Sequence, residues 1–275
     1  VTDEIVKNVA PDVGRKYIPH AVDLNIYKPL EGKLVKNLRD DNFKENKDKF
    51  ILFWNNRNAR RKMGSSLILW FKDFLDKVGH DKAILLMHTN PKDPAGPDLE
   101  ALIEKLGLGN GQVLFSRDKL APENLAAMYN IVDCTINISD AEGFGLGTLE
   151  SLSCGTPIIV NMTGGLQEQV TDGEEWFGIG LEPASKSIVG SQEVPFIYED
   201  RLSKESVVEA MLEMYNKTPQ QRKALGLKGH EHVKKNYNFD NFIKTWDEVF
   251  TKIHEKEGSW ETRNRKQNWT LEEVA

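Results

Sequence analysis

Hydrophobic positions along the chain follow two alternating spacings. Short continuous apolar runs recur, and we expect each to form a buried strand. The runs span residues 49–54, 82–88, 111–116, 133–139 and 156–161. Between them, apolar residues such as Leu67, Phe71 and Leu75 recur every three or four positions, which predicts amphipathic helices. Strands that alternate with helices predict βαβ units and a parallel sheet.

The expected fold class is therefore α/β: a Rossmann-like doubly wound parallel sheet with extra C-terminal helices. The first 23 residues predict a helix, a turn and a strand. Residues 174–203 show no clear period and predict an irregular segment, which could be an insertion. Three helices are expected over 204–217, 218–237 and 238–257, followed by a polar tail. In such a fold, ligands bind beyond the C-terminal ends of the strands.

The segment "EGFGLGTLE" (residues 142–150) lies between a predicted strand and a predicted helix. Its three glycines permit positive φ and a close approach of the backbone to a ligand. The N-terminus of the following helix attracts anions. The carboxylate of Glu150, near the start of that helix, can accept hydrogen bonds from sugar hydroxyls. The loop thus predicts a ligand with an anionic part and a polyol part.

Two other interpretations of this loop stay open. It is also compatible with an ordinary strand–loop–helix connection, in which Glu150 complements the helix dipole. A dinucleotide fingerprint is disfavoured, because the glycines follow G-x-G-x-G rather than G-x-G-x-x-G and the next strand ends in Asn161 instead of an acid.

A basic cluster follows the first strong strand, within "NNRNARRKMGSS" (residues 55–66). Its cations are Arg57, Arg60, Arg61 and Lys62. Arginine can fork onto phosphate oxygens and lysine can act as a point charge. Because this strand end should share the ligand edge of the sheet with the glycine loop, the cluster predicts a diphosphate site; the alternative is a solvated basic turn.

Composition narrows the possible partners. The 275 residues carry a net charge of -6, which argues against a nucleic-acid partner. No apolar run approaches the length of a membrane span. Cys134 and Cys154 form neither a disulfide framework nor a metal-ligand pattern, so we expect a cytoplasmic location. The first residue is Val1, and we expect the chain to be part of a longer protein.

These motifs together resemble a known family, the retaining GT-B glycosyltransferases of family 4 (glycosyl transferases group 1), and its C-terminal donor-binding domain in particular. "EGFGLGTLE" is similar to the family's E-x7-E motif, and Arg57 with Lys62 resembles its R-x4-K pair. The segments "CGTPIIVNMTGGLQEQVTDG" (residues 154–173) and "YIPHAVDLNIYKP" (residues 17–29) resemble the strand–Gly-Gly region and the link between the two GT-B domains.

The resemblance implies a role for each matching residue. Glu142 would be the catalytic residue, near the donor sugar and in contact with its hydroxyls, and Glu150 would bind the ribose hydroxyls. The turn of residues 115–120 would line the nucleobase pocket, whereas His88 is expected to be structural. The implied ligands of the rest of the donor are Arg57, Lys62, Thr148 and the backbone of Phe144, Gly145 and Leu146. Asn56 departs from the family, which usually has glycine there.

The resemblance also implies the reaction: transfer of a sugar from a UDP- or GDP-sugar to an unknown acceptor, with retention of configuration. GT-B enzymes generally need no metal at the diphosphate, and the chain contains no Asp-x-Asp. We therefore expect no metal and no cofactor besides the nucleotide sugar. Membrane association stays open.

The implied organisation has three parts. Residues 1–25 would be a remnant of an N-terminal domain with the interdomain link, residues 26–240 the donor-binding domain, and residues 241–275 a helix that crosses back, with a polar tail. The acceptor domain would be missing from this chain. Two alternatives remain: a stand-alone nucleotide-sugar-binding module without transferase activity, and a GT-B-type nucleotide-sugar epimerase.

Overall fold

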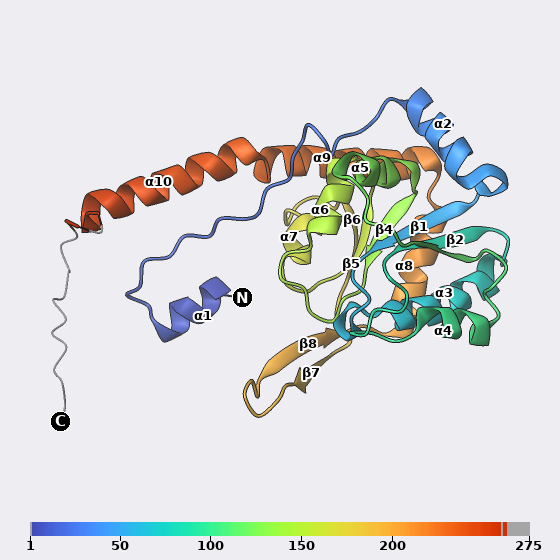
Figure 1. The fold of residues 1–275 in the computed structure, drawn as a ribbon, viewed down its shortest axis with the longest axis horizontal. Coiled ribbons are helices and arrows are strands. Elements are labelled where there is room, and N and C mark those ends of the chain that lie inside the picture. The colour runs from blue at the N-terminus through green and yellow to red at the C-terminus, as the bar shows by residue number, and fades with distance from the viewer. Residues whose placement is uncertain (1, 260, 263–275) are drawn as a thin grey trace. The chain divides into compact units, whose positions relative to one another are not determined.

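The structure is a computed structural model that describes residues 2–259 and 261–262 (Figure 1). The chain divides into two compact units. The larger comprises Val22–Asn236, and the smaller comprises Val1–Ala21 with Tyr237–Ala275. The two units are described separately.

The larger unit is built on a six-stranded parallel sheet with the strand order β3-β2-β1-β4-β5-β6. The strands are β1 (Phe50–Asn55), β2 (Ala83–His88), β3 (Val113–Ser116), β4 (Cys134–Asn137), β5 (Ile158–Asn161) and β6 (Gly178–Leu181). The order changes direction between β1 and β4, which makes the sheet doubly wound. The predicted fold class is confirmed, and all five predicted strands are present.

Helices cover both faces of this sheet. On one side α3 packs against both α4 and α8, and on the other α6 packs against both α5 and α9 (Figure 1). The helices of the unit are α2 (Gly32–Phe43), α3 (Gly64–Val78), α4 (Leu99–Leu106), α5 (Pro122–Ile131), α6 (Leu146–Ser153), α7 (Leu166–Val170), α8 (Lys204–Asn216) and α9 (Pro219–Asn236). Short 3-10 turns, η1 (Lys44–Asn46) and η2 (Arg60–Lys62), precede β1 and α3.

The central strand β1 explains why the strand signals are continuous apolar runs. Leu52 and Trp54 join the core formed with α3, α4 and α8. Phe53 points to the other face, where its ring meets Tyr129 of α5 at a centroid distance of 5.4 Å. Successive side chains of a strand point to opposite faces, so a sheet covered on both sides needs apolar residues at every position.

Two expectations differ from the structure. Residues 174–203 are not irregular: they form β6 and an antiparallel hairpin of β7 (Ser185–Val189) and β8 (Ile197–Arg201). β6 has the sequence GIGL, which is too glycine-rich to give a strand signal, and most side chains of the hairpin are exposed, so no period appears. The strand expected within the first 23 residues is absent apart from a bridge at Val22. Pro11 and Pro19 interrupt that segment.

The smaller unit contains α1 (Thr2–Val9) and α10 (Phe239–Glu257). α10 begins at Asn238, whose side chain accepts a hydrogen bond from the Asn241 N–H, and it ends at Gly258 with φ 81°. The helix predicted over residues 238–257 is confirmed. In the part of the chain that the structure describes, no helix is both long and apolar enough to cross a membrane.

Candidate functional site

The candidate site lies at the switch point of the sheet, where β1 and β4 end side by side. A cavity of about 80 Å³ opens there. Its walls come from the end of β1, from η2, from β4 and from the start of α6, and its lining residues are Asn55, Asn56, Lys62, Thr135, Ile136, Asn137, Glu142, Gly145, Leu146, Gly147 and Thr148. The structure thus brings the glycine loop and one residue of the basic cluster to a single cavity.

The glycine loop needs its glycines for two reasons. Gly145 caps the N-terminus of α6 with φ 88°, a conformation that favours glycine. The neighbouring Gly164 approaches the loop so closely that a Cβ there would lie 1.7 Å from the carbonyl oxygen of Glu142. The Gly-Gly turn after β5 therefore packs backbone against backbone, which holds Glu142 and the start of α6 in place.

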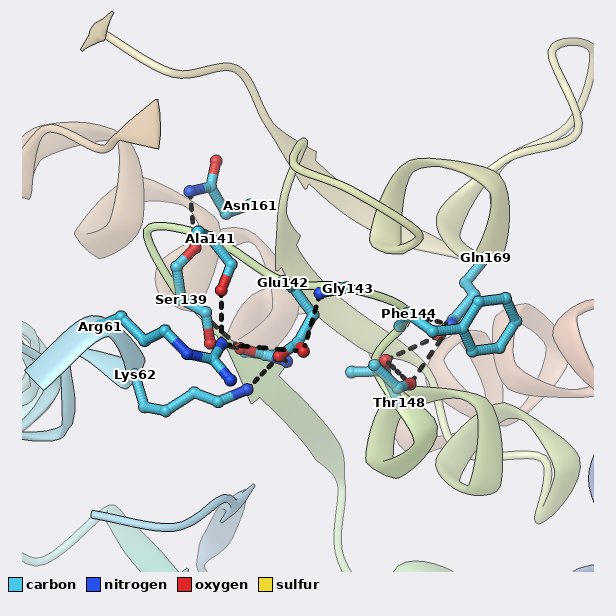
Figure 2. Close-up of polar contacts among 12 residues, drawn as sticks. Arg61, Lys62, Ser139, Ala141, Glu142, Gly143, Phe144, Thr148, Asn161 and Gln169 are labelled. Carbon is cyan, nitrogen blue, oxygen red and sulfur yellow. Dashed lines mark hydrogen bonds and ion pairs between the residues drawn. The ribbon is translucent and has the colours of Figure 1, made fainter. Parts of the chain in front are cut away.

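Glu142 forms an ion pair with Lys62 (Figure 2). Both side chains are only 10% exposed. The N–H of Gly143 donates to the other carboxylate oxygen at 3.1 Å, and Arg61 donates to the carbonyl of Ala141 at 2.6 Å. Burial lowers the pKa of Lys62, and the ion pair with Glu142 opposes that shift. A cation and a carboxylate are thus paired inside the cavity.

Glu150, in α6, is held by tyrosines. The hydroxyl of Tyr129 donates to its carboxylate at 2.9 Å and accepts from the amide of Asn55 at 2.7 Å. Tyr27 contributes a second hydroxyl. Burial raises the pKa of Glu150, and the two tyrosine hydrogen bonds oppose the rise. Because buried carboxylates are costly unless hydrogen-bonded, these donors favour the ionised form.

Arg57 is not at the cavity. Its side chain is 67% exposed and forms a two-point ion pair with Asp93, at 2.8 and 3.0 Å. Arg60 is also engaged elsewhere, with Glu199 of β8. Of the four cations in the predicted cluster, only Lys62 lines the cavity, with Arg61 next to it.

The base of the β7–β8 hairpin reaches the same edge of the sheet. Arg201 donates to Glu199 at 2.7 Å and to the buried Asp140 at 2.6 Å. Burial raises the pKa of Asp140 to about 6, although the cation of Arg201 acts against that rise. The N–H of Asp200 donates to the carbonyl of Asp140 at 2.7 Å. The hairpin is therefore tied to the loop that carries Glu142.

The predicted nucleobase turn follows β3. His88, at the end of β2, contacts the Ser116 hydroxyl through Nδ1 at 2.9 Å, and burial lowers its pKa. Arg117 forms an ion pair with Glu100. Neither contact involves the cavity. Within the described residues, no group of three or more His, Cys, Asp or Glu side chains could hold a metal ion.

Sequence reasoning missed several residues that shape the site. Tyr129 and Asn55 hold Glu150, and Gln169 of α7 contacts the glycine loop. Asn55 had one usable signal, because a polar residue at the end of a buried apolar run marks the ligand edge of a sheet. In the sequence, Tyr129 cannot be distinguished from an ordinary core residue. Gln169 lies in a helix of five residues, which is too short to show a hydrophobic period.

Comparison with known proteins places this geometry in a family. The family model for glycosyl transferases group 1 matches residues 35–230. D-inositol 3-phosphate glycosyltransferase of Paenarthrobacter aurescens (strain TC1) is 28% identical over 176 residues, which are 62% of this chain and 41% of that protein. Its counterpart in Acidothermus cellulolyticus (strain ATCC 43068 / DSM 8971 / 11B) is 39% identical over 87 residues, 31% of this chain and 19% of that protein.

Solved structures share the fold at low identity. Sucrose-phosphate synthase from Thermosynechococcus elongatus superposes with a TM-score of 0.72 at 21% identity, covering 92% of this chain and 56% of that one. Anabaena Alr3699/HepE, solved with UDP and glucose, gives a TM-score of 0.67 at 16% identity over 86% of this chain and 56% of that one. The match is to the Rossmann-like architecture of GT-B glycosyltransferases.

This chain spans less than half the length of the curated relatives described above. The family match, by contrast, covers most of the larger unit, from α2 through most of α9, and includes the whole cavity. The chain belongs to the glycosyl transferases group 1 family.

Proposed function

We propose that this chain carries the donor-binding half of a retaining glycosyltransferase, which transfers a sugar from a nucleoside diphosphate sugar to an acceptor. One observation carries the proposal: Lys62, Glu142 and the N-terminus of α6 meet at a single cavity at the switch point of the sheet. Glu150 follows within the same helix. This arrangement provides for both parts of the donor, a phosphate group and a hydroxylated sugar.

The diphosphate would bind between Lys62 and the first N–H groups of α6. Helix N-termini present N–H groups that no residue of the helix itself can satisfy, and their dipole favours an anion. When the bond to the sugar breaks, negative charge accumulates on the departing diphosphate. Donors fixed in advance stabilise that charge more than they stabilise the bound substrate, which accelerates the reaction without a metal ion.

Glu142 would serve the donor sugar. Its carboxylate now neutralises Lys62. A diphosphate would compete for that cation and free the carboxylate oxygens for sugar hydroxyls. Arg57 remains a predicted diphosphate ligand, and it would have to exchange Asp93 for phosphate. Thr148, at the cavity wall, is proposed to contact the donor as well.

Glu150 would bind the ribose of the nucleotide. Two tyrosine hydroxyls favour the ionised form that accepts hydrogen bonds from both ribose hydroxyls. A UDP- or GDP-sugar is the proposed donor, and the complex of HepE with UDP and glucose supports testing uracil nucleotides first. The acceptor is proposed to bind to an N-terminal domain outside this chain, in the cytoplasm.

The direct test is calorimetric titration of this chain with UDP, GDP and ADP, and with their glucose and mannose conjugates. We expect one nucleotide to bind, and to bind equally well in excess EDTA. Lys62→Ala and Glu150→Ala should each weaken binding by more than about 1 kcal/mol. Lys77→Ala and Glu205→Ala remove exposed charges elsewhere in the same unit and should leave binding unchanged.

The outcomes separate the possible functions. A folded chain that binds none of these nucleotides would refute the proposal. Binding without transfer, even when an acceptor domain from a relative is supplied, favours a stand-alone binding module. Conversion of the donor in the absence of any acceptor favours an epimerase. Retention is tested by the anomeric configuration of the transferred sugar in the NMR spectrum of the product.

A further inference from the structure

Helix α7 contacts the glycine loop on the side opposite the cavity. None of the residues of α7 lines the cavity, whereas the loop residues Gly145 and Leu146 do. Figure 2 shows Gln169 beside Phe144 and Thr148, with Lys62 and Glu142 on the other side of the view. The loop is thus held between the helix and the cavity.

Gln169 is fully buried, and both ends of its amide are hydrogen-bonded. Its Nε2 donates to the carbonyl of Phe144 at 2.7 Å and to the carbonyl of Gly145 at 3.2 Å. Its Oε1 accepts from the hydroxyl of Thr148 at 2.7 Å. The amide nitrogen faces two carbonyl acceptors, and the amide oxygen faces a hydroxyl donor. Only one of the two flipped orientations of the amide satisfies these contacts. The side chain has 0% exposure, and its amide bonds both to the loop and to the first turn of α6, so it helps to fix the conformation of that loop.

The direction of the carbonyls determines the direction of the following N–H groups. In a planar trans peptide, the C=O of one residue and the N–H of the next point in opposite directions. The carbonyls of Phe144 and Gly145 point to Gln169, so the N–H groups of Gly145 and Leu146 point away from α7, toward the cavity side. A third carbonyl of the loop is held by the backbone, since the N–H of Gly165 donates to the carbonyl of Gly143 at 3.0 Å.

We propose that Gln169 is a positioning residue for the donor diphosphate: by holding the carbonyls of Phe144 and Gly145, it aims the N–H groups of Gly145 and Leu146 at the phosphate oxygens. This inference rests on the proposed function. Gln169 does not touch the donor. It acts on two peptide planes of a loop rich in glycine, where peptide planes flip easily. The carbonyl of Gly145 also accepts from the Leu149 N–H at 3.3 Å and from the Thr148 hydroxyl at 2.8 Å, so α6 shares in aiming the N–H of Leu146.

If Gln169 only stabilised the packing of α7, its replacement would change nucleotide binding in a different way. Loss of packing at α7 would weaken binding of every part of the nucleotide. Loss of oriented N–H groups would weaken only the contribution of the phosphates. The informative quantity is therefore the ratio of the dissociation constants of nucleoside monophosphate and nucleoside diphosphate, which measures what the second phosphate adds to affinity.

The experiment measures UMP and UDP affinities by calorimetry for the wild type, Gln169→Met and Gln169→Asn, or the corresponding GMP or AMP pair if the wild type prefers another base. Met keeps the length of the side chain without its polar atoms. Asn keeps the amide but is too short to reach Thr148 and Phe144 together. Gln167→Met is the matched control, because Gln167 is exposed on the same helix and its amide donates to the carbonyl of Gly164, at 3.3 Å, rather than to the glycine loop.

We expect both Gln169 variants to reduce the UMP-to-UDP ratio by about tenfold, the scale of one hydrogen bond to a charged group. UMP affinity should change less than about threefold, and Gln167→Met should behave as wild type. An unchanged ratio in a folded variant, or equal losses for UMP and UDP, would overturn the inference. If Gln169→Met does not fold, the UMP-to-UDP ratio of Gln169→Asn tests the inference. A wild type that binds no nucleotide at all refutes the proposed function instead.

Discussion

Replacing Tyr129 by Phe tests whether a buried hydroxyl sustains the ionised Glu150. The substitution keeps the ring and its edge contact with Phe53. It removes a hydrogen bond to a carboxylate and leaves the amide of Asn55 without the acceptor it now has at 2.7 Å. A bond to a charged group contributes about 1.5–3 kcal/mol, whereas the half-buried amide of Asn55 lines the cavity, where water can replace the lost acceptor. We expect the free energy of unfolding at pH 8 to fall by about 1.5–3 kcal/mol.

The pH dependence gives the sharper signature. Burial holds the pKa of Glu150 in the folded protein above its usual value, so ionisation of this carboxyl destabilises the folded state as pH rises. The hydroxyl of Tyr129 offsets part of that effect, and its loss raises the pKa of Glu150 further. The variant should therefore lose more stability at pH 8 than at pH 5, where a larger fraction of Glu150 is protonated in the folded protein.

The assay is urea unfolding of the wild type and the variant at pH 5 and pH 8, with comparable m-values as evidence of the same transition. Tyr198→Phe is the control, because its hydroxyl is on the exposed hairpin strand β8, and it should change the free energy of unfolding by less than about 0.5 kcal/mol. A loss for Tyr129→Phe that is the same at both pH values, or as small as the control, would refute the reasoning.

Three further predictions concern the same edge of the sheet. Glu142→Gln removes the carboxylate that pairs with Lys62, so UDP should bind at least about fivefold tighter by calorimetry. Opposite charges in contact gain about 1 kcal/mol even at the dielectric constant of water, and both side chains of this pair are only 10% exposed; weaker binding would contradict the prediction. Gly164→Ala forces a Cβ against the Glu142 carbonyl at φ 52° and should lower the free energy of unfolding by at least about 2 kcal/mol in urea. Arg201→Ala removes the cation beside Asp140, whose pKa is about 6, so urea unfolding should show a loss of about 1–3 kcal/mol at pH 8 and a smaller one at pH 5.

The Gly164 prediction has a matched comparison, and the Arg201 prediction has a definite sign. A Cβ added at Gly143 would have no heavy atom within 4 Å, so Gly143→Ala should lower the free energy of unfolding far less than Gly164→Ala. For Arg201, the sign follows from burial: a carboxyl whose folded-state pKa is raised destabilises the protein as pH rises, and removing its cation enlarges that effect. A loss that is larger at pH 5 than at pH 8 would show that Asp140 is not the group involved.

Much of the fold could be predicted because its signals are local. β1 is a continuous apolar run, as a strand covered on both faces must be. The glycines that precede α6 indicate where that helix begins. The location of the candidate site followed from topology, since β1 and β4 have to end at the same edge. β6 and the β7–β8 hairpin could not be predicted, because GIGL has too few apolar side chains and the hairpin buries too little to impose a period.

The sequence by itself determined which chemical groups are present and along which edge they lie. Order along the chain places Glu142 and the basic cluster just after strand ends, and Glu150 in the helix that follows the glycine loop. Only the tertiary structure decided which of them meet. Lys62 pairs with Glu142 and Arg57 turns to Asp93, although the two cations are five positions apart in the same turn. The physical reason is that hydrogen bonds and ion pairs form only when two polar atoms lie about 3 Å apart, within a few tenths of an ångström. Atoms far apart in sequence, such as those of Gln169 and Phe144, meet this condition only in the folded chain, and spacing along the chain does not encode it.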